Sequence, residues 1–130
     1  MGIMAFAALT SQAQKTSIPD VVKAKVTATY PKATALKFEK EGKDFEAGFK
    51  NEGKDMSILM DAQGNILETE TDITVAELPK TVQDYLSKNF KGKKIKEAAT
   101  IVDAKGMKKF EAEIGGKDYL FDEKGNLLKK

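Results

Sequence analysis

One segment that the chain contains twice constrains the fold more than any other sequence feature. It spans Ile58–Leu67 and again Tyr119–Leu128, and in both copies apolar residues flank an Asp-x-x-Gly-Asn sequence. Asp at the start of a tight turn accepts hydrogen bonds from the following backbone, and Gly adopts the left-handed conformation that closes the turn. Each copy therefore predicts a β-hairpin.

A helix signal precedes the strands in each half of the chain. Within residues 19–31, which begin and end with proline, Val22, Val26 and Tyr30 recur at every fourth position, as on one face of a helix. Proline is accepted in a first helical turn and ends a helix that reaches it. The same apolar spacing recurs in the second half at Val82, Leu86 and Phe90.

Alternating apolar and polar residues indicate β-strands between the helix signals and the hairpins. The sequence Phe45–Ala47 in the first half returns as Phe110–Ala112 in the second, whose first hairpin is longer, around residues 103–106. Strict alternation is typical of antiparallel sheets with one buried and one solvated face. The sequence therefore predicts an α+β fold. The predicted architecture is a tandem repeat of one helix followed by about four antiparallel strands, with the helices packed on one face of the sheet.

The predicted domain organisation is an export signal at residues 1–13, a first repeat at 14–73 and a second repeat at 74–130. Residues 3–9 form an apolar run, and Ser11–Ala13 supplies small residues where a signal peptidase cleaves. The run is too short to span a bilayer, and no other run is long enough. An apolar helix that packs on the core is the alternative interpretation. We expect a periplasmic or secreted protein with no transmembrane segment in its mature form.

Composition removes several functional classes. The chain has no Cys and no His, which excludes Ser-His-Asp and Cys-His catalysis and disfavours zinc or iron enzymes. Lys+Arg number 22 against 20 Asp+Glu, and the lysine pairs are scattered, so no nucleic-acid surface is predicted. We therefore expect a non-enzymatic protein without catalytic residues or an obligate cofactor, although carboxylates alone leave a hydrolase open.

Alternating acids indicate one candidate metal site. Glu68, Glu70 and Asp72 would share a face of one strand, where their carboxylates could hold Ca²⁺. The alternative is a charged edge strand that resists aggregation. The two Asp-x-x-Gly-Asn turns also offer oxygen ligands, but they have fewer acidic positions than an EF-hand loop, which favours ordinary turn chemistry.

Two leucines indicate a candidate partner-binding surface. Leu59 and Leu120 occupy matching places in the two hairpins and point away from the core-facing residues beside them. An apolar residue on a solvated sheet face often marks a contact surface, although burial under a loop or between the repeats is the alternative. Neighbouring positions on the same face are expected to be Glu46, Gly48, Ser57, Glu111 and Glu113.

These motifs together resemble the PepSY-like proteins, also called putative beta-lactamase-inhibitor-like proteins. The resemblance rests on the helix starts Ile18–Pro19 and Leu78–Pro79, the aromatic helix ends Tyr30 and Phe90, the Phe-Glu-Ala strands and the closing turns. It covers residues 18 to 130 and implies tandem helices on an antiparallel sheet in a periplasmic or secreted protein. It also implies relatedness to beta-lactamase inhibitor protein and to PepSY domains, for which a role in restraining other proteins has been suggested.

The functional expectation follows from this resemblance and from the composition. It is an exported, non-enzymatic binding module that recognises or inhibits an unidentified envelope or secreted protein. A periplasmic Ca²⁺-binding or Ca²⁺-responsive protein is the alternative.

Overall fold

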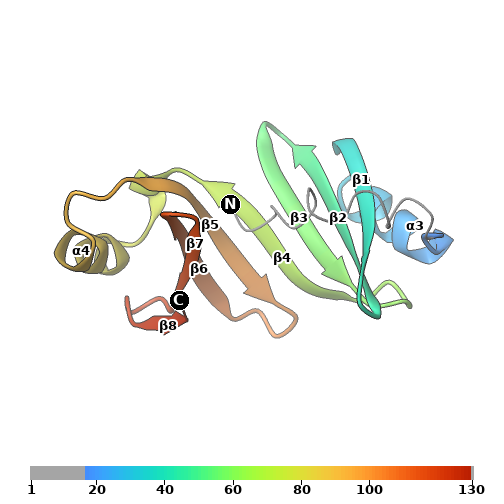
Figure 1. Ribbon diagram of the computed structural model, residues 1–130. Coiled ribbons are helices and arrows are strands. Elements are labelled where there is room, and N and C mark those ends of the chain that lie inside the picture. Colours follow the sequence, from blue (N-terminus) through green and yellow to red (C-terminus); the bar gives the residue numbers. More distant parts are fainter. Residues whose placement is uncertain (1–16, 130) are drawn as a thin grey trace. The chain divides into compact units, whose positions relative to one another are not determined.

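The computed structural model describes residues 17–129, so the predicted export signal lies outside the described residues. The fold is α+β: this part of the chain contains two α-helices and an eight-stranded antiparallel sheet with strand order β1 to β8 (Figure 1). The chain divides into two compact units after Glu70, within strand β4. The sequence placed the boundary after Ile73.

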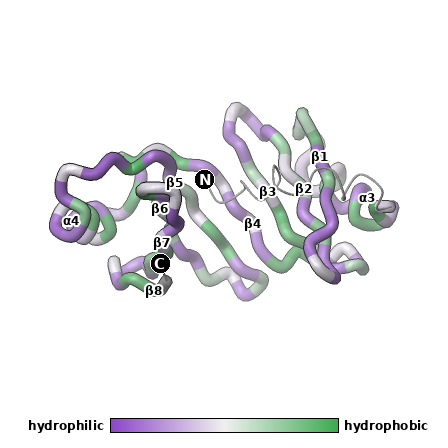
Figure 2. Tube along the Cα trace, viewed as in Figure 1, coloured by the Kyte–Doolittle hydropathy of each residue, from purple (hydrophilic) through white to green (hydrophobic). Residues whose placement is uncertain are grey.

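The first unit consists of one helix followed by strands. These are α3 (Asp20–Thr29), β1 (Thr34–Glu41), β2 (Asp44–Asn51), β3 (Lys54–Met60) and the first part of β4 (Ile66–Ile73). The strands β1, β2 and β3 pair antiparallel in sequence order, with Ala47 between Phe38 and Ile58. Figure 2 shows that β4 is largely hydrophilic between its apolar ends.

Helix α3 is bounded as the sequence predicts. Pro19 occupies the N-cap, and the backbone N–H of Tyr30 closes the last turn by donating to the Val26 carbonyl over 2.8 Å. Val22 and Val26 are fully buried, which shows that the apolar stripe faces the sheet. They form a core with Phe45, Ala47, Phe49, Met56, Ile58 and Met60.

Strand β1 departs from simple alternation. Leu36 and Phe38 are separated by one lysine, so regular strand alternation would bury both, yet the Leu36 side chain is 41% exposed. A bulge lies between Thr34 and Lys37, and Ala35 within it has a φ of 54°. Because an extra residue in a bulge interrupts the alternation of side chains, Leu36 is turned out of the core.

The second unit contains the same order of elements, with one addition. After the end of β4 come the 3₁₀-helix η2 (Val75–Glu77), α4 (Lys80–Asn89), β5 (Ile95–Asp103), β6 (Lys108–Ile114), β7 (Lys117–Phe121) and β8 (Leu127–Lys129). In the antiparallel register of β5, β6 and β7, Ala112 lies between Ala98 and Tyr119. The buried core consists of Leu78, Val82, Leu86, Ala98, Phe110, Ala112, Ile114 and Phe121.

The segment before α4 is fixed by side-chain hydrogen bonds. The Glu77 carboxylate accepts hydrogen bonds from the backbone N–H and the hydroxyl of Thr74, at 2.8 and 3.1 Å. The Gln83 amide donates to the carbonyl of Leu78 over 2.7 Å. Pro79 is the N-cap of α4, and the N–H of Phe90 donates to the Leu86 carbonyl over 2.9 Å, as at the end of α3.

Candidate functional site

The sheet of the first unit has a face opposite α3, which we call the first open face. It is defined by Glu39, Glu46, Gly48, Ser57 and Leu59. Strand pairing places Glu39 opposite Glu46 and Glu46 opposite Leu59, while Gly48 lies opposite Ser57. Because side chains alternate along a strand, these residues point away from the core residues beside them.

This face is less solvated than its polar sequence predicted. Ser57 is 3% exposed and Glu39 is 8% exposed, and both are therefore buried. Ser57 lies on β3, which is flanked on both sides by hydrogen-bonded strands. Leu59 is half-buried and does not belong to the core.

Crowding of carboxylates gives the first open face unusual electrostatics. The pKa of Glu46 is raised from 4.5 to about 8, first by burial and then by a hydrogen bond to Glu41 and charge repulsion from it. Burial also raises the pKa of Glu39, again with repulsion from Glu41. Removing a carboxylate from water disfavours its charged form, and a neighbouring negative charge does the same.

The second unit has a comparable surface on the side of its sheet away from α4, which we call the second open face. It is defined by Glu97, Ala99, Glu111, Glu113 and Leu120. Glu111 lies between Ala99 and Leu120, so a leucine again lies opposite a glutamate. Glu111 is 6% exposed and Glu113 is 9% exposed, whereas Leu120 is half-buried and outside the core.

The three predicted metal ligands all lie on β4. Glu70 is buried at 8% exposure, and Glu68 and Asp72 are half-buried. Within residues 17–129, no three acidic side chains are grouped closely enough to hold a metal ion. Alternation along the strand places them on one side of it, but the structure does not gather them into a coordination site. Binding of Ca²⁺ at this strand stays a prediction.

The aspartates of the closing turns direct their oxygens to their own backbone. Oδ1 of Asp61 accepts hydrogen bonds from the backbone N–H groups of Gln63 and Asn65, both over 2.9 Å. The Asn65 side-chain amide donates to Oδ2 over 3.0 Å, and these bonds from Asn65 hold the pKa of Asp61 below its ordinary value. Asp122 makes the same set of bonds. Ordinary turn chemistry therefore accounts for both motifs.

A third turn of this kind closes the longer hairpin predicted around residues 103–106, although its likeness to the two closing turns was not predicted. Oδ1 of Asp103 accepts hydrogen bonds from the backbone N–H groups of Lys105 and Met107, both over 2.9 Å. The spacing of Asp103 to Gly106 is the same as in the two closing turns, and it was the available signal. Met107 occupies the position that Asn has in the closing turns. Asp103 therefore accepts the two backbone hydrogen bonds, but a methionine side chain cannot donate the third bond that the Asn amide makes.

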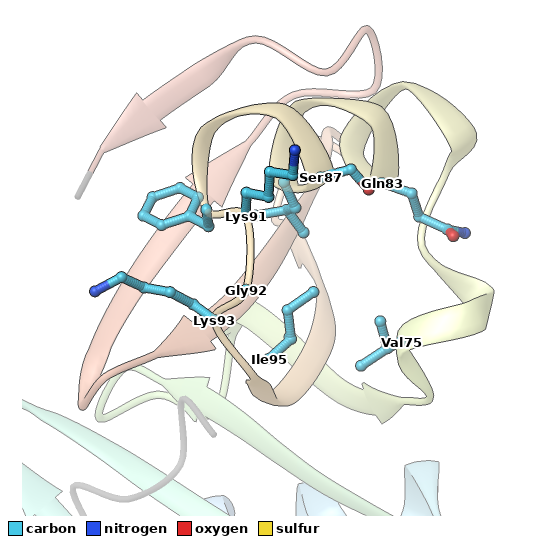
Figure 3. A pocket seen from close by; sticks show the side chains of 9 residues that line it. Val75, Gln83, Ser87, Lys91, Gly92, Lys93 and Ile95 are labelled. Atoms are coloured by element: carbon cyan, nitrogen blue, oxygen red, sulfur yellow. The ribbon is translucent and has the colours of Figure 1, made fainter.

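The second unit also contains a pocket that sequence reasoning did not find. It has a volume of about 440 Å³ and lies between the end of α4 and the start of β5. Val75, Ile95, Lys91 and Lys93 are among the residues that line it, and Figure 3 shows the two lysine side chains extending away from Val75 and Ile95. The sequence offered only a lysine-rich segment after the helix, which is typical of solvated surface.

Comparison with known proteins assigns the family. The family described as "Putative beta-lactamase-inhibitor-like, PepSY-like" matches residues 8–68 and 61–129. A search of curated proteins finds no significant match. Within residues 17–129, neither helix has the length and apolar character needed to traverse a bilayer.

Solved structures of similar fold come from Bacteroides species. A structure described as putative periplasmic proteins, from Bacteroides eggerthii, has a TM-score of 0.80 at 19% identity, covering 88% of both chains. A BLIP-like protein from Bacteroides fragilis has a TM-score of 0.73 at 24% identity, covering 90% of this chain and 89% of the other. A DUF2874 family protein from Bacteroides uniformis has a TM-score of 0.77 at 20% identity, covering 85% and 86%. These likenesses show the fold, and the two matched segments show that the chain belongs to the PepSY-like, putative beta-lactamase-inhibitor-like family.

Proposed function

We propose that the chain is an exported, non-enzymatic binding module that recognises or inhibits another envelope or secreted protein through its open sheet faces. Membership of the family and the periplasmic and BLIP-like descriptions of proteins with the same fold support this proposal. The observation that carries it is the matched position of Leu59 and Leu120, one on each open face.

The surroundings of the two leucines are those of a contact surface. Each lies opposite a glutamate, Glu46 or Glu111, and each is half-buried but outside the core of its unit. An apolar side chain framed by polar groups is the usual pattern of a protein interface, where the apolar centre is desolvated and the rim stays polar. The shared register also supports an origin of the two units as tandem repeats, each with a helix packed on one face.

The test is capture of envelope or secreted proteins by cross-linking to the purified mature protein, followed by mass spectrometry. Leu59→Glu combined with Leu120→Glu should abolish capture of the wild-type partners, because two charges then occupy the apolar centres of the faces. A matched control, Leu36→Glu with Met107→Glu, places the same charges at two exposed positions, one in each unit.

Circular dichroism would show that both double variants are folded. The proposal is wrong if the face variant captures the same proteins as the wild type, or if the control variant loses them to the same extent.

A further inference from the structure

The first open face carries carboxylates that face each other across two strands. Glu39 on β1 and Glu46 on β2 are register partners, and Glu41 lies two residues beyond Glu39 on the same side of β1. Repulsion from Glu39 and Glu41 contributes to the raised pKa of Glu46, which shows that these groups act on one another electrostatically.

On this face, the Glu39 carboxylate is buried without a hydrogen-bond donor for one of its oxygens, Oε1, within the described part of the chain. A carboxylate oxygen removed from water without a donor is unfavourable, and a cationic donor is the group that best satisfies it. The fold therefore leaves Oε1 of Glu39 as a buried hydrogen-bond acceptor, and the Glu41 carboxylate nearby repels its charged form.

Among the described residues of β1, β2 and β3, strand pairing places two lysines on this face, Lys37 and Lys50. Strand pairing places Lys37, Glu39, Glu41, Asp44, Glu46, Lys50, Asp55 and Ser57 on it, and β4 carries Glu68 and Glu70 beside β3. Lys50 is engaged by Asp55 at 3.3 Å. Lys37 is exposed, and its effect on the pKa of Glu39 is smaller than that of burial or of Glu41.

We propose that the first open face receives a lysine or arginine side chain of a protein partner, with its charged head between Glu39 and Glu46 and its aliphatic stem against Leu59. This inference rests on the proposed function and names the chemistry of the partner. Both long basic side chains combine an apolar stem with a charged end, which matches a leucine next to two carboxylates. A metal ion fits less well, because no group of three acidic side chains within residues 17–129 could hold one.

Seating a cation here should release a proton. With a pKa of about 8, Glu46 is about nine-tenths protonated at pH 7. A positive charge beside it favours the carboxylate, so its pKa falls on binding and the proton leaves. Binding by contacts that do not involve this carboxyl group would release none.

The probe is a blocked peptide of alternating leucine and arginine, titrated into the ¹⁵N-labelled mature protein. We expect the amide signals of Glu39, Glu46 and Leu59 to move, and affinity to fall roughly tenfold or more in Glu39→Gln with Glu46→Gln. Asp20→Asn with Glu123→Gln is the matched control, because it makes the same number of carboxyl-to-amide changes at exposed positions, and it should change affinity less than about twofold.

Calorimetry at pH 7 in two buffers of different ionisation enthalpy measures the proton count. We expect roughly 0.5 to 1 proton released per peptide by the wild type and close to none by the Gln variant. Equal affinity of the two variants, binding without proton release, or a response of these residues to Ca²⁺ but not to the peptide would each overturn the inference. If the inference fails while capture still depends on Leu59 and Leu120, the binding function stands and only the chemistry of its partner is wrong.

Discussion

The turn at Gly125 supports a quantitative prediction, because it touches the start of α4. The Thr81 hydroxyl donates a hydrogen bond to the Glu123 carbonyl over 3.3 Å, which holds the turn against the helix. A Cβ atom added at Gly125 would lie 2.7 Å from Cβ of Thr81 and 2.9 Å from its carbonyl carbon and oxygen. In the first unit, a Cβ atom added at Gly64 would similarly lie 3.2 Å from Cγ2 of Val21.

Gly125→Ala should destabilise the protein through two effects. The φ of Gly125 is +87°, and a side chain in this left-handed region costs about 1–2 kcal/mol. The contact with the Thr81 backbone adds about 1–3 kcal/mol, as for other overpacked sites. Gly53→Ala is the matched control, since Gly53 has a φ of +83° but would meet nothing within 4 Å. It should show only the backbone cost.

Urea unfolding followed by circular dichroism measures both variants. With a slope of about 1.5 kcal/mol per molar urea, the midpoint should fall by about 1 M in Gly53→Ala and by roughly 2–3 M in Gly125→Ala. Equal midpoints for the two variants would show that the turn does not press on the helix, and would refute the reasoning.

Two further predictions concern pH and the second core. The pKa of Glu46 is raised from 4.5 to about 8, so its contribution to stability is complete below pH 4.5 and is lost as pH rises through 8. Glu46→Gln should therefore leave unfolding at pH 4 unchanged but stabilise the protein by about 2 kcal/mol at pH 9, after allowance for solvent screening, and an equal pH dependence of both proteins in urea melts would contradict this. Phe121 is fully buried, so Phe121→Ala should cost about 3–5 kcal/mol in thermal unfolding, whereas Met107→Ala, at a side chain that is 63% exposed, should cost under about 0.5 kcal/mol.

Local patterns in the sequence predicted much of the fold. The turns at Asp61 and Asp122 depend on residues within five positions of one another, so their hydrogen bonds follow from composition and spacing. The helices follow from one apolar stripe each, bounded by proline and an aromatic residue. The family assignment is confirmed because it depends on these same local features.

Features that depend on strand register could not be predicted from the sequence. Alternation placed Leu59 and Leu120 away from the core, but it could not show that Glu39 lies opposite Glu46. The bulge that exposes Leu36 also escaped prediction, because a left-handed alanine has no sequence signal. Pairing between strands decides which acids meet, and that information is not local.

The strand order has a consequence for how the chain reaches its native state. Within each unit, the pairs β1–β2, β2–β3, β5–β6, β6–β7 and β7–β8 join strands that follow one another in the sequence, so these pairings need no distant segment. Low contact order lowers the entropy lost in closing loops and is associated with rapid folding. We therefore expect hairpins to form early and independently along the chain, which shortens the time during which unpaired strand edges are open to aggregation.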